Sequence, residues 1–168
     1  MAQRLAFEER VLFSPHLPES VNQLLQQAVA ASRAEKPLAE KLFKQAQQLD
    51  PSCLQTYFAL YKFYFYQGRL QEAEREVNAG LKQAAQQGNF PNDYRLLAGE
   101  ENHWDMYASE VALFYLYTLK ALAFIKLRQN QTSEARLILS IIALLDPEDR
   151  SGASVIMQLS EALEPEEI

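Results

Sequence analysis

Cysteine, glycine and proline are scarce in this sequence, and each scarcity argues against a class of protein. The single cysteine, Cys53, cannot form a disulfide within the chain, which suggests a reducing compartment. Five glycines and seven prolines in 168 residues are too few for a loop-rich β protein or a disordered chain. Hydrophobic residues make up 48% of the chain, so one domain with a sizeable core is expected.

Positive charge and long apolar runs are also lacking. The net charge is -6, whereas a nucleic-acid partner requires a basic face. The first residues include Glu8, Glu9 and Arg10, where a secretion signal would be apolar. The longest apolar stretch, residues 111–125, is shorter than a membrane span and contains Lys120. We therefore expect a cytoplasmic protein with neither a nucleic-acid nor a membrane partner.

Three segments of the chain align by their small and apolar residues. They are Ala39–Pro51, Ala73–Ala85 and Ala135–Pro147, and the first two begin 34 residues apart. The third begins 62 residues after the second, which is one such period plus an insertion of 28 residues. A period of this length is typical of stacked helix–turn–helix units.

The residues around these segments predict where helices end and begin. Gly68 and Asn130 stand where the leading helices of the second and third units should end in a left-handed residue. Thr132 or Ser133 is expected to cap the helix that follows Asn130. The insertion, Gly88 to Glu110, should be a loop with a helical turn at Tyr94–Leu97, and its end is expected to extend the next helix backwards.

These features resemble the tetratricopeptide repeat (TPR) family. The residues that carry the resemblance are Ala39, Phe43, Ala46, Asp50 and Pro51; Tyr57, Leu60, Tyr64, Gly68, Ala73 and Leu81; and Leu119, Leu122, Ala123, Ala135 and Pro147. The resemblance implies an all-α fold with three helical hairpins in a right-handed superhelix. Two positions depart from the small alanine that the family favours, namely Gly80 and Ile142.

The domain organisation expected from this resemblance covers the whole chain, 1–168. Its parts are an N-terminal arm (1–17), repeats 1 and 2 (18–87), the insertion (88–110), repeat 3 (111–149), and a capping helix with an acidic tail (150–168). Stacked repeats leave apolar end faces that need a cap. The capping helix is expected to bury one apolar stripe, made of Val155, Ile156, Leu159 and Leu163.

Catalytic and cofactor motifs are not evident in the chain. It has no phosphate-binding loop, no nucleophile elbow and no paired-histidine zinc signature. Glu100, Glu101, His103 and Asp105 could gather a metal ion, but their spacing fits no known ligand pattern and a solvated acidic loop is the preferred interpretation. Cys53 is interpreted as a packing residue. We therefore predict a non-enzymatic protein without a cofactor.

Seven of the ten residues from Tyr57 to Tyr66 are aromatic, which is more than one helix face can bury. Another element or a partner must cover the remainder. In the TPR family the leading helices line a concave groove that holds partner polypeptides. Carrying those positions over gives Phe58, Lys62, Phe65, Tyr66, Tyr117, Lys120, Phe124, Leu127 and Arg128, with Val21, Leu24, Ala28 and Ser32 from the first repeat.

Such an aromatic, partly cationic groove would suit a peptide with apolar anchors and a carboxylate. The resemblance therefore implies an adaptor or assembly factor of bacterial type. The stretches SPHLPESVNQLL, YFALYKFYFY and FYLYTLKALAFIKLR also resemble small TPR proteins that accompany nitrogen-fixation genes. The alternative is a type III secretion-type chaperone for an apolar client. Self-association through Phe63 or the N-terminal arm is a further expectation.

Overall fold

The structure is a computed structural model that describes residues 17–99 and 103–163. These residues form seven α-helices and one short 3-10 helix, with no strand among them. The helices are α2 (Glu19–Ala31), α3 (Lys36–Leu49), α4 (Leu54–Tyr66), α5 (Leu70–Gly88), η1 (Tyr94–Leu97), α6 (Glu110–Arg128), α7 (Thr132–Leu145) and α8 (Ala153–Leu163). The predicted all-α class is confirmed, while residues 1–16 of the arm and 164–168 of the tail lie outside the described residues.

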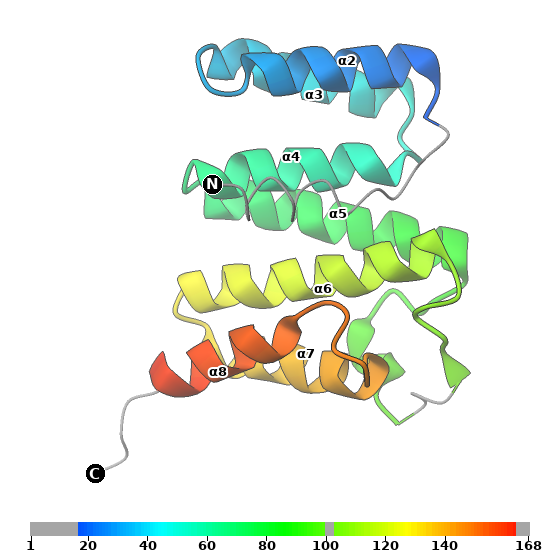
Figure 1. The fold of residues 1–168 in the computed structure, drawn as a ribbon, viewed down its shortest axis with the longest axis vertical. Coiled ribbons are helices and arrows are strands. Elements are labelled where there is room, and N and C mark those ends of the chain that lie inside the picture. Colours follow the sequence, from blue (N-terminus) through cyan, green and yellow to red (C-terminus); the bar gives the residue numbers. More distant parts are fainter. Residues whose placement is uncertain (1–16, 100–102, 164–168) are drawn as a thin grey trace.

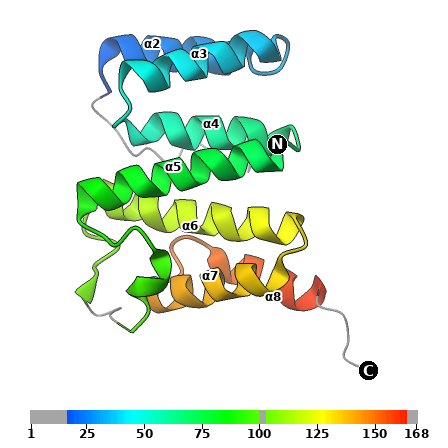
Figure 2. The same ribbon diagram turned by 180° about the vertical axis from the view of Figure 1, so that it is seen from behind.

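The helices are stacked along the long axis of the molecule in two layers. Helices α2, α4, α6 and α8 lie in one layer, and α3, α5 and α7 lie in the other (Figures 1 and 2). Each helix packs against its neighbours in the chain, and α6 also packs against α4 and α8 in its own layer. Helices α4, α6 and α8 therefore present one continuous surface.

The ends of α4 and α6 have the same backbone geometry, as the sequence predicts. Gly68 and Asn130 have φ angles of 74° and 62°, in the left-handed region. At both ends the next amide reaches back five residues, from Arg69 to the Tyr64 carbonyl at 3.0 Å and from Gln131 to the Lys126 carbonyl at 2.8 Å. The two turns are thus equivalent, and asparagine replaces glycine because its short side chain tolerates this conformation.

The insertion is partly as predicted. The expected helical turn is present as η1 at Tyr94–Leu97. The expected backward extension of α6 into the insertion is limited to Glu110, where the helix begins and the Ser109 hydroxyl accepts a hydrogen bond from the Ala112 amide at 3.1 Å. The predicted cap by Thr132 or Ser133 is wrong, since Gln131 occupies the N-cap of α7 and makes no side-chain capping bond.

The two Leu-Asp-Pro sequences end α3 and α7 in similar polar turns. The Asp50 carboxylate accepts hydrogen bonds from the amide and hydroxyl of Ser52 at 3.1 and 2.6 Å. The buried Asp146 carboxylate accepts from the amide and hydroxyl of Ser151 at 2.9 and 2.6 Å, from the Arg150 amide at 2.9 Å, and from the Tyr107 hydroxyl. The turn at Asp146 connects α7 to α8.

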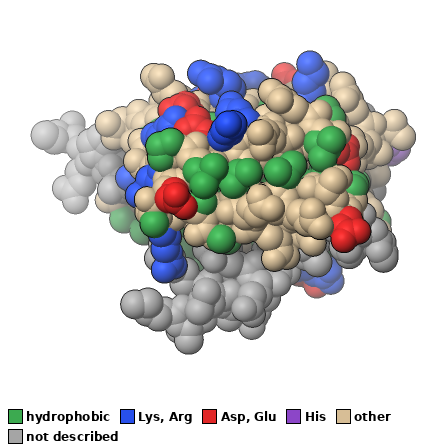
Figure 3. Space-filling model, turned by 90° about the horizontal axis from the view of Figure 1, so that it is seen from above, with side chains coloured by type: hydrophobic (Ala, Val, Ile, Leu, Met, Phe, Trp, Pro, Cys, Tyr) green, Lys and Arg blue, Asp and Glu red, His purple; other side chains and the backbone are tan. Residues whose placement is uncertain are grey.

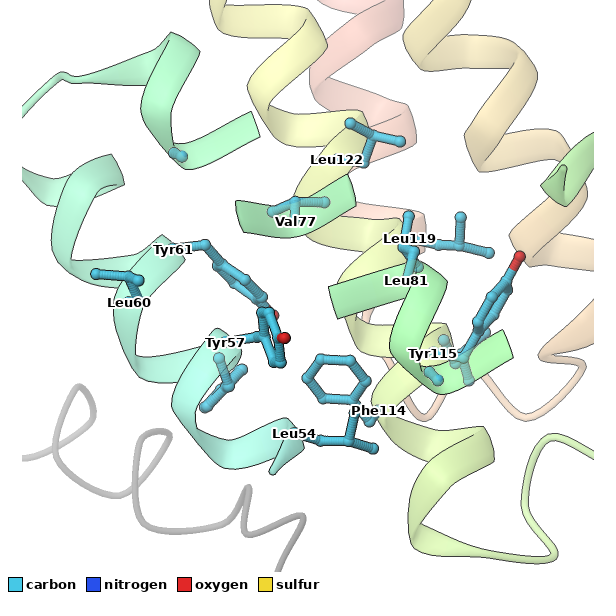
Figure 4. Close-up of a cluster of buried hydrophobic side chains, with 14 of the residues drawn as sticks. Leu54, Tyr57, Leu60, Tyr61, Val77, Leu81, Phe114, Tyr115, Leu119 and Leu122 are labelled. Atoms are coloured by element: carbon cyan, nitrogen blue, oxygen red, sulfur yellow. The ribbon is translucent and has the colours of Figure 1, made fainter. Parts of the chain in front are cut away.

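The middle of the core is formed where α4, α5 and α6 meet (Figure 4). Tyr57 and Tyr61 from α4, Val77 and Leu81 from α5, and Phe114 and Leu119 from α6 converge there. Gly80 lets α5 approach this cluster closely. A Cβ atom added to Gly80 would lie 3.0 Å from the Phe114 ring and 3.2 Å from Tyr57 Cβ. The departure from alanine at this position therefore has a steric cause.

Helix α3 joins the first hairpin to the rest of the stack through one ring contact and a polar network. The rings of Phe43 and Phe63 are 5.2 Å apart, and the predicted availability of Phe63 for self-association is wrong because this side chain is buried. Arg69 donates two hydrogen bonds to the Glu40 carboxylate at 2.9 and 3.2 Å, and Tyr64 donates a third at 2.9 Å. The Arg69 bond is the main cause that lowers the pKa of Glu40.

Both ends of the stack expose apolar side chains. A row of hydrophobic side chains crosses the face of α2 and α3 (Figure 3). Val29 of α2 and Leu38 and Leu49 of α3 are exposed. At the other end, the predicted buried stripe of α8 is wrong, since Val155 and Leu159 are 59% and 46% exposed. Helix α8 instead buries Ala153 and Ser160 and half-buries Ile156 and Met157, so its packed face is turned away from Val155 and Leu159.

Gly80→Leu should lower the free energy of unfolding by about 1–3 kcal/mol, because the added atoms meet Phe114 and Tyr57. Gly80→Ala is the matched control, since its gain in helix propensity of about 1 kcal/mol opposes a milder overlap. Urea unfolding followed by far-ultraviolet circular dichroism measures both variants. A Gly80→Leu protein as stable as the wild type would contradict the close approach.

Asp146→Asn should lower the free energy of unfolding at pH 7 by about 1–3 kcal/mol. Burial alone would raise the pKa of Asp146, but the hydrogen bonds from Ser151, Tyr107 and Arg150 hold it below its ordinary 3.8. The folded state therefore favours the ionised Asp146 carboxylate. The contribution of this carboxylate to the free energy of unfolding is complete above its ordinary pKa and is lost as the pH falls through its lowered pKa in the folded protein. Urea unfolding from pH 7 to pH 3 should show the difference between the two proteins shrinking below about pH 4. A difference independent of pH would contradict this account.

Candidate functional site

A cavity of about 260 Å³ opens between α4, α6 and α8. These three helices belong to one layer of the stack (Figures 1 and 2). The lining residues are Tyr61, Lys62, Phe65 and Tyr66 of α4, Lys120, Ala121, Phe124 and Ile125 of α6, and Ile156 of α8. Cavities that hold cofactors are usually about 300–1,000 Å³, so this one matches one or two side chains of a bound polypeptide better.

Aromatic rings form the walls of this cavity. The rings of Phe65 and Phe124 are 5.3 Å apart and tilted by 47°, which joins α4 to α6 across the cavity. Tyr66 packs edge-on against Phe65 at 5.8 Å and is 54% exposed. Neither Phe65 nor Phe124 is fully buried. These rings therefore leave apolar surface that an incoming side chain could cover.

Two cations stand over aromatic rings beside the cavity. The Lys62 ammonium lies 4.6 Å from the centre of the Phe58 ring, and the Arg128 guanidinium lies 5.6 Å from the centre of the Phe65 ring. Such contacts hold a cation at a defined place without neutralising its charge. Lys62 of α4 and Arg128 of α6 therefore place two cationic side chains at the margin of the cavity, although the chain as a whole carries a net charge of -6.

Lys120 has a structural role that the sequence does not reveal. Its ammonium donates a hydrogen bond to the Ser151 carbonyl at 2.7 Å, just before α8 begins. Burial lowers the pKa of Lys120, and the nearby carboxylates of Asp149 and Asp146 act in the opposite direction. The Tyr117 hydroxyl donates to the Arg150 carbonyl at 2.8 Å in the same region. Both side chains fasten α6 to the turn that positions α8.

The structure brings together five of the nine predicted groove residues. These five line the cavity and are Lys62, Phe65, Tyr66, Lys120 and Phe124. Phe58 and Leu127 are not among the lining residues and are only 7% and 6% exposed. Tyr117 and Arg128 lie beside the cavity, in the contacts given above. In the first hairpin, Val21 and Ala28 are buried, which contradicts their predicted place in the groove.

Sequence reasoning missed four residues of the cavity wall. They are Tyr61, Ala121, Ile125 and Ile156. The signal for Tyr61 and Ile125 was available. Tyr61 lies four residues before Phe65, and Ile125 lies three residues before Arg128, so each shares a helix face with a predicted groove residue. Tyr61 also shares a hydrogen bond with Thr118 across α4 and α6, at 3.3 Å between the two hydroxyl oxygens. No periodicity of α4 or α6 could have shown that Ile156 of α8 completes the wall.

From the sequence alone, two other places are candidate sites of chemistry, the acidic stretch around His103 and the cysteine Cys53. His103 packs edge-on against Trp104 with ring centres 4.6 Å apart, while Glu100 and Glu101 lie outside the described residues. Within residues 17–99 and 103–163 no three potential metal-ligating side chains cluster. Cys53 is buried at the start of α4.

None of the described helices combines the length and the apolar character needed to cross a bilayer. Comparison of the chain with known proteins finds no matching family model, no matching curated protein and no matching solved structure. A functional interpretation therefore depends on the residues of the cavity and its margin.

Lys120→Met should loosen α8 without emptying the cavity wall, because methionine keeps most of the side-chain stem and loses the bond to Ser151. A lost hydrogen bond of about 1 kcal/mol corresponds to roughly five-fold faster hydrogen exchange in residues 153–163. Lys62→Met is the matched control, since Lys62 lines the same cavity from α4. Equal exchange rates in all three proteins would contradict the role of Lys120 in positioning α8.

Proposed function

We propose that this chain is a non-enzymatic protein-interaction module that binds a segment of another polypeptide at the cavity of α4, α6 and α8. The observation that carries the proposal is the combination of an open apolar cavity, aromatic walls from Phe65 and Phe124, and a positive margin at Lys62 and Arg128. Peptide-recognition surfaces commonly pair such pockets for apolar anchors with charges that select acidic motifs.

We infer that the helices form a TPR-like superhelix of three hairpins, α2–α3, α4–α5 and α6–α7, with α8 as its cap. The 34-residue period, the matching turns at Gly68 and Asn130 and the two-layer stack support this inference. In such an arrangement the layer of α2, α4, α6 and α8 is the inner one. The candidate cavity lies in that layer, where TPR proteins hold their partners.

The proposed partner segment carries apolar or aromatic anchors and at least one carboxylate. Anchors would cover the exposed parts of Phe65, Phe124 and Tyr66, and a carboxylate would be attracted to Arg128 and Lys62. The resemblance to small proteins that accompany nitrogen-fixation genes extends the proposal to an adaptor or assembly factor of that bacterial pathway. A secretion-type chaperone would use the same cavity for an aggregation-prone client.

Ala121→Phe should abolish partner binding, because a ring added at this lining position occupies the cavity. Ala143→Phe is the matched control, since Ala143 is exposed on α7 in the other layer. Partners captured from a native extract by the wild type should be retained by the control and lost by Ala121→Phe. For the purified partner, the dissociation constant of Ala121→Phe should be at least ten-fold larger than that of the wild type. Equal capture by both variants would place binding elsewhere.

The charged margin is tested by a second pair of variants. Lys62→Glu with Arg128→Glu should weaken binding of an acidic segment by about ten-fold, and the loss should grow as salt concentration falls. Arg75→Glu with Lys82→Glu is the matched control, because it makes the same charge change at exposed positions of α5 in the opposite layer.

A captured protein that stays soluble only in complex with this chain would identify the chaperone alternative instead of the adaptor.

A further inference from the structure

The chemistry of the cavity narrows the kind of segment that fits it. Among the described residues that line the cavity none is acidic, and its only charged groups are the ammonium ions of Lys62 and Lys120. Its walls are aromatic on the side of Phe65 and Phe124 and aliphatic on the side of Ile125 and Ile156. A fitting ligand therefore presents closely spaced aromatic and aliphatic side chains with a carboxylate beside them.

The chain itself contains a segment of this composition. Residues 5–13 read LAFEERVLF. Two adjacent carboxylates, Glu8 and Glu9, and the cation of Arg10 lie between Phe7 on one side and Val11, Leu12 and Phe13 on the other. A short stretch with so many large apolar side chains is costly to leave in water and gains free energy wherever it finds an apolar surface.

The segment is also close enough in the sequence to reach the cavity. The described part of the chain begins at Leu17, immediately before α2. The stretch from Leu5 to Leu17 spans at most about 43 Å when fully extended, and the stretch from Phe7 to Leu17 about 36 Å. Helix α4, at 1.5 Å per residue, is only about 20 Å long. A tethered ligand acts at an effective concentration in the millimolar range, so even weak complementarity can produce substantial occupancy.

We propose that residues 5–13 of this chain bind in the cavity of α4, α6 and α8 as an internal ligand. The proposal rests on the proposed function, because it assigns a competitor to the same site. Phe7 and Phe13 supply the apolar anchors, and Glu8 and Glu9 face the cations of the margin. An external partner then binds only by displacing this segment. Its apparent affinity equals its intrinsic affinity multiplied by the fraction of chains whose cavity is open.

Photo-crosslinking in the full-length chain tests the location of the segment. With benzoylphenylalanine in place of Phe7 or Phe13, mass spectrometry should find intramolecular crosslinks to residues 61–66 and 120–125. Ala121→Phe should reduce these crosslinks at least five-fold, and Ala143→Phe should leave them unchanged. Crosslinks to the exposed end face at Val29, Leu38 and Leu49, or crosslinks found only between two chains, would overturn the proposal.

Competition in the full-length chain tests the consequence. A fluorescent synthetic peptide of residues 1–16 is the probe, and Phe7→Ala with Phe13→Ala should raise its affinity for the chain at least ten-fold by freeing the cavity. Gln3→Ala with Ser14→Ala is the matched control and should bind the probe as the wild type does. Equal affinity for all three chains would overturn the internal ligand.

The two proposals fail in distinguishable ways. If Ala121→Phe blocks an external partner while the crosslinks of Phe7 and Phe13 fall elsewhere, the proposed function stands and the internal ligand is wrong. If the crosslinks fall in the cavity while partner capture is insensitive to Ala121→Phe, the segment binds there but the cavity is not the site for other proteins.

Discussion

The excess of aromatic side chains on α4 is the constraint on which the rest of the structure depends. A helix buries one face against a single neighbour, yet α4 carries seven aromatic residues around its circumference. The stack satisfies them by packing α4 between several elements. Phe63 contacts Phe43 of α3, Tyr57 and Tyr61 enter the core shared with α5 and α6, and Phe65 contacts Phe124 of α6.

Polar contacts then decide the angles and ends of the helices that this packing brings together. Arg69 and Glu40 join α4 and α5 to α3, and the Asp146 turn joins α7 to α8. Hydrogen bonds that involve a charged group contribute about 1.5–3 kcal/mol each when they are well shielded, which is comparable to burying one large side chain. These contacts therefore select one arrangement among several that would bury similar apolar area.

The candidate cavity is a consequence of the same packing. Phe65, Tyr66 and Phe124 lie on the side of α4 and α6 that is not packed into the core. Helix α8 covers only part of this side, through Ile156. Lys120 holds α8 at that position through Ser151. The half-buried Lys120 ammonium group, which holds α8 against the cavity, couples the shape of the proposed binding site to the stability of the last helix.

The sequence by itself determined the helical class, the left-handed ends at Gly68 and Asn130 and the turn at Tyr94–Leu97, because these depend on local backbone preferences and on spacing along one helix. It also placed Lys62, Phe65, Tyr66, Lys120 and Phe124 together. Only the tertiary structure decided that Phe58 and Leu127 are buried, that Lys120 holds α8, and that Ile156 faces the cavity while Val155 and Leu159 face solvent. These outcomes depend on how each helix is rotated against its neighbours, and that rotation is settled by side chains distant in the sequence.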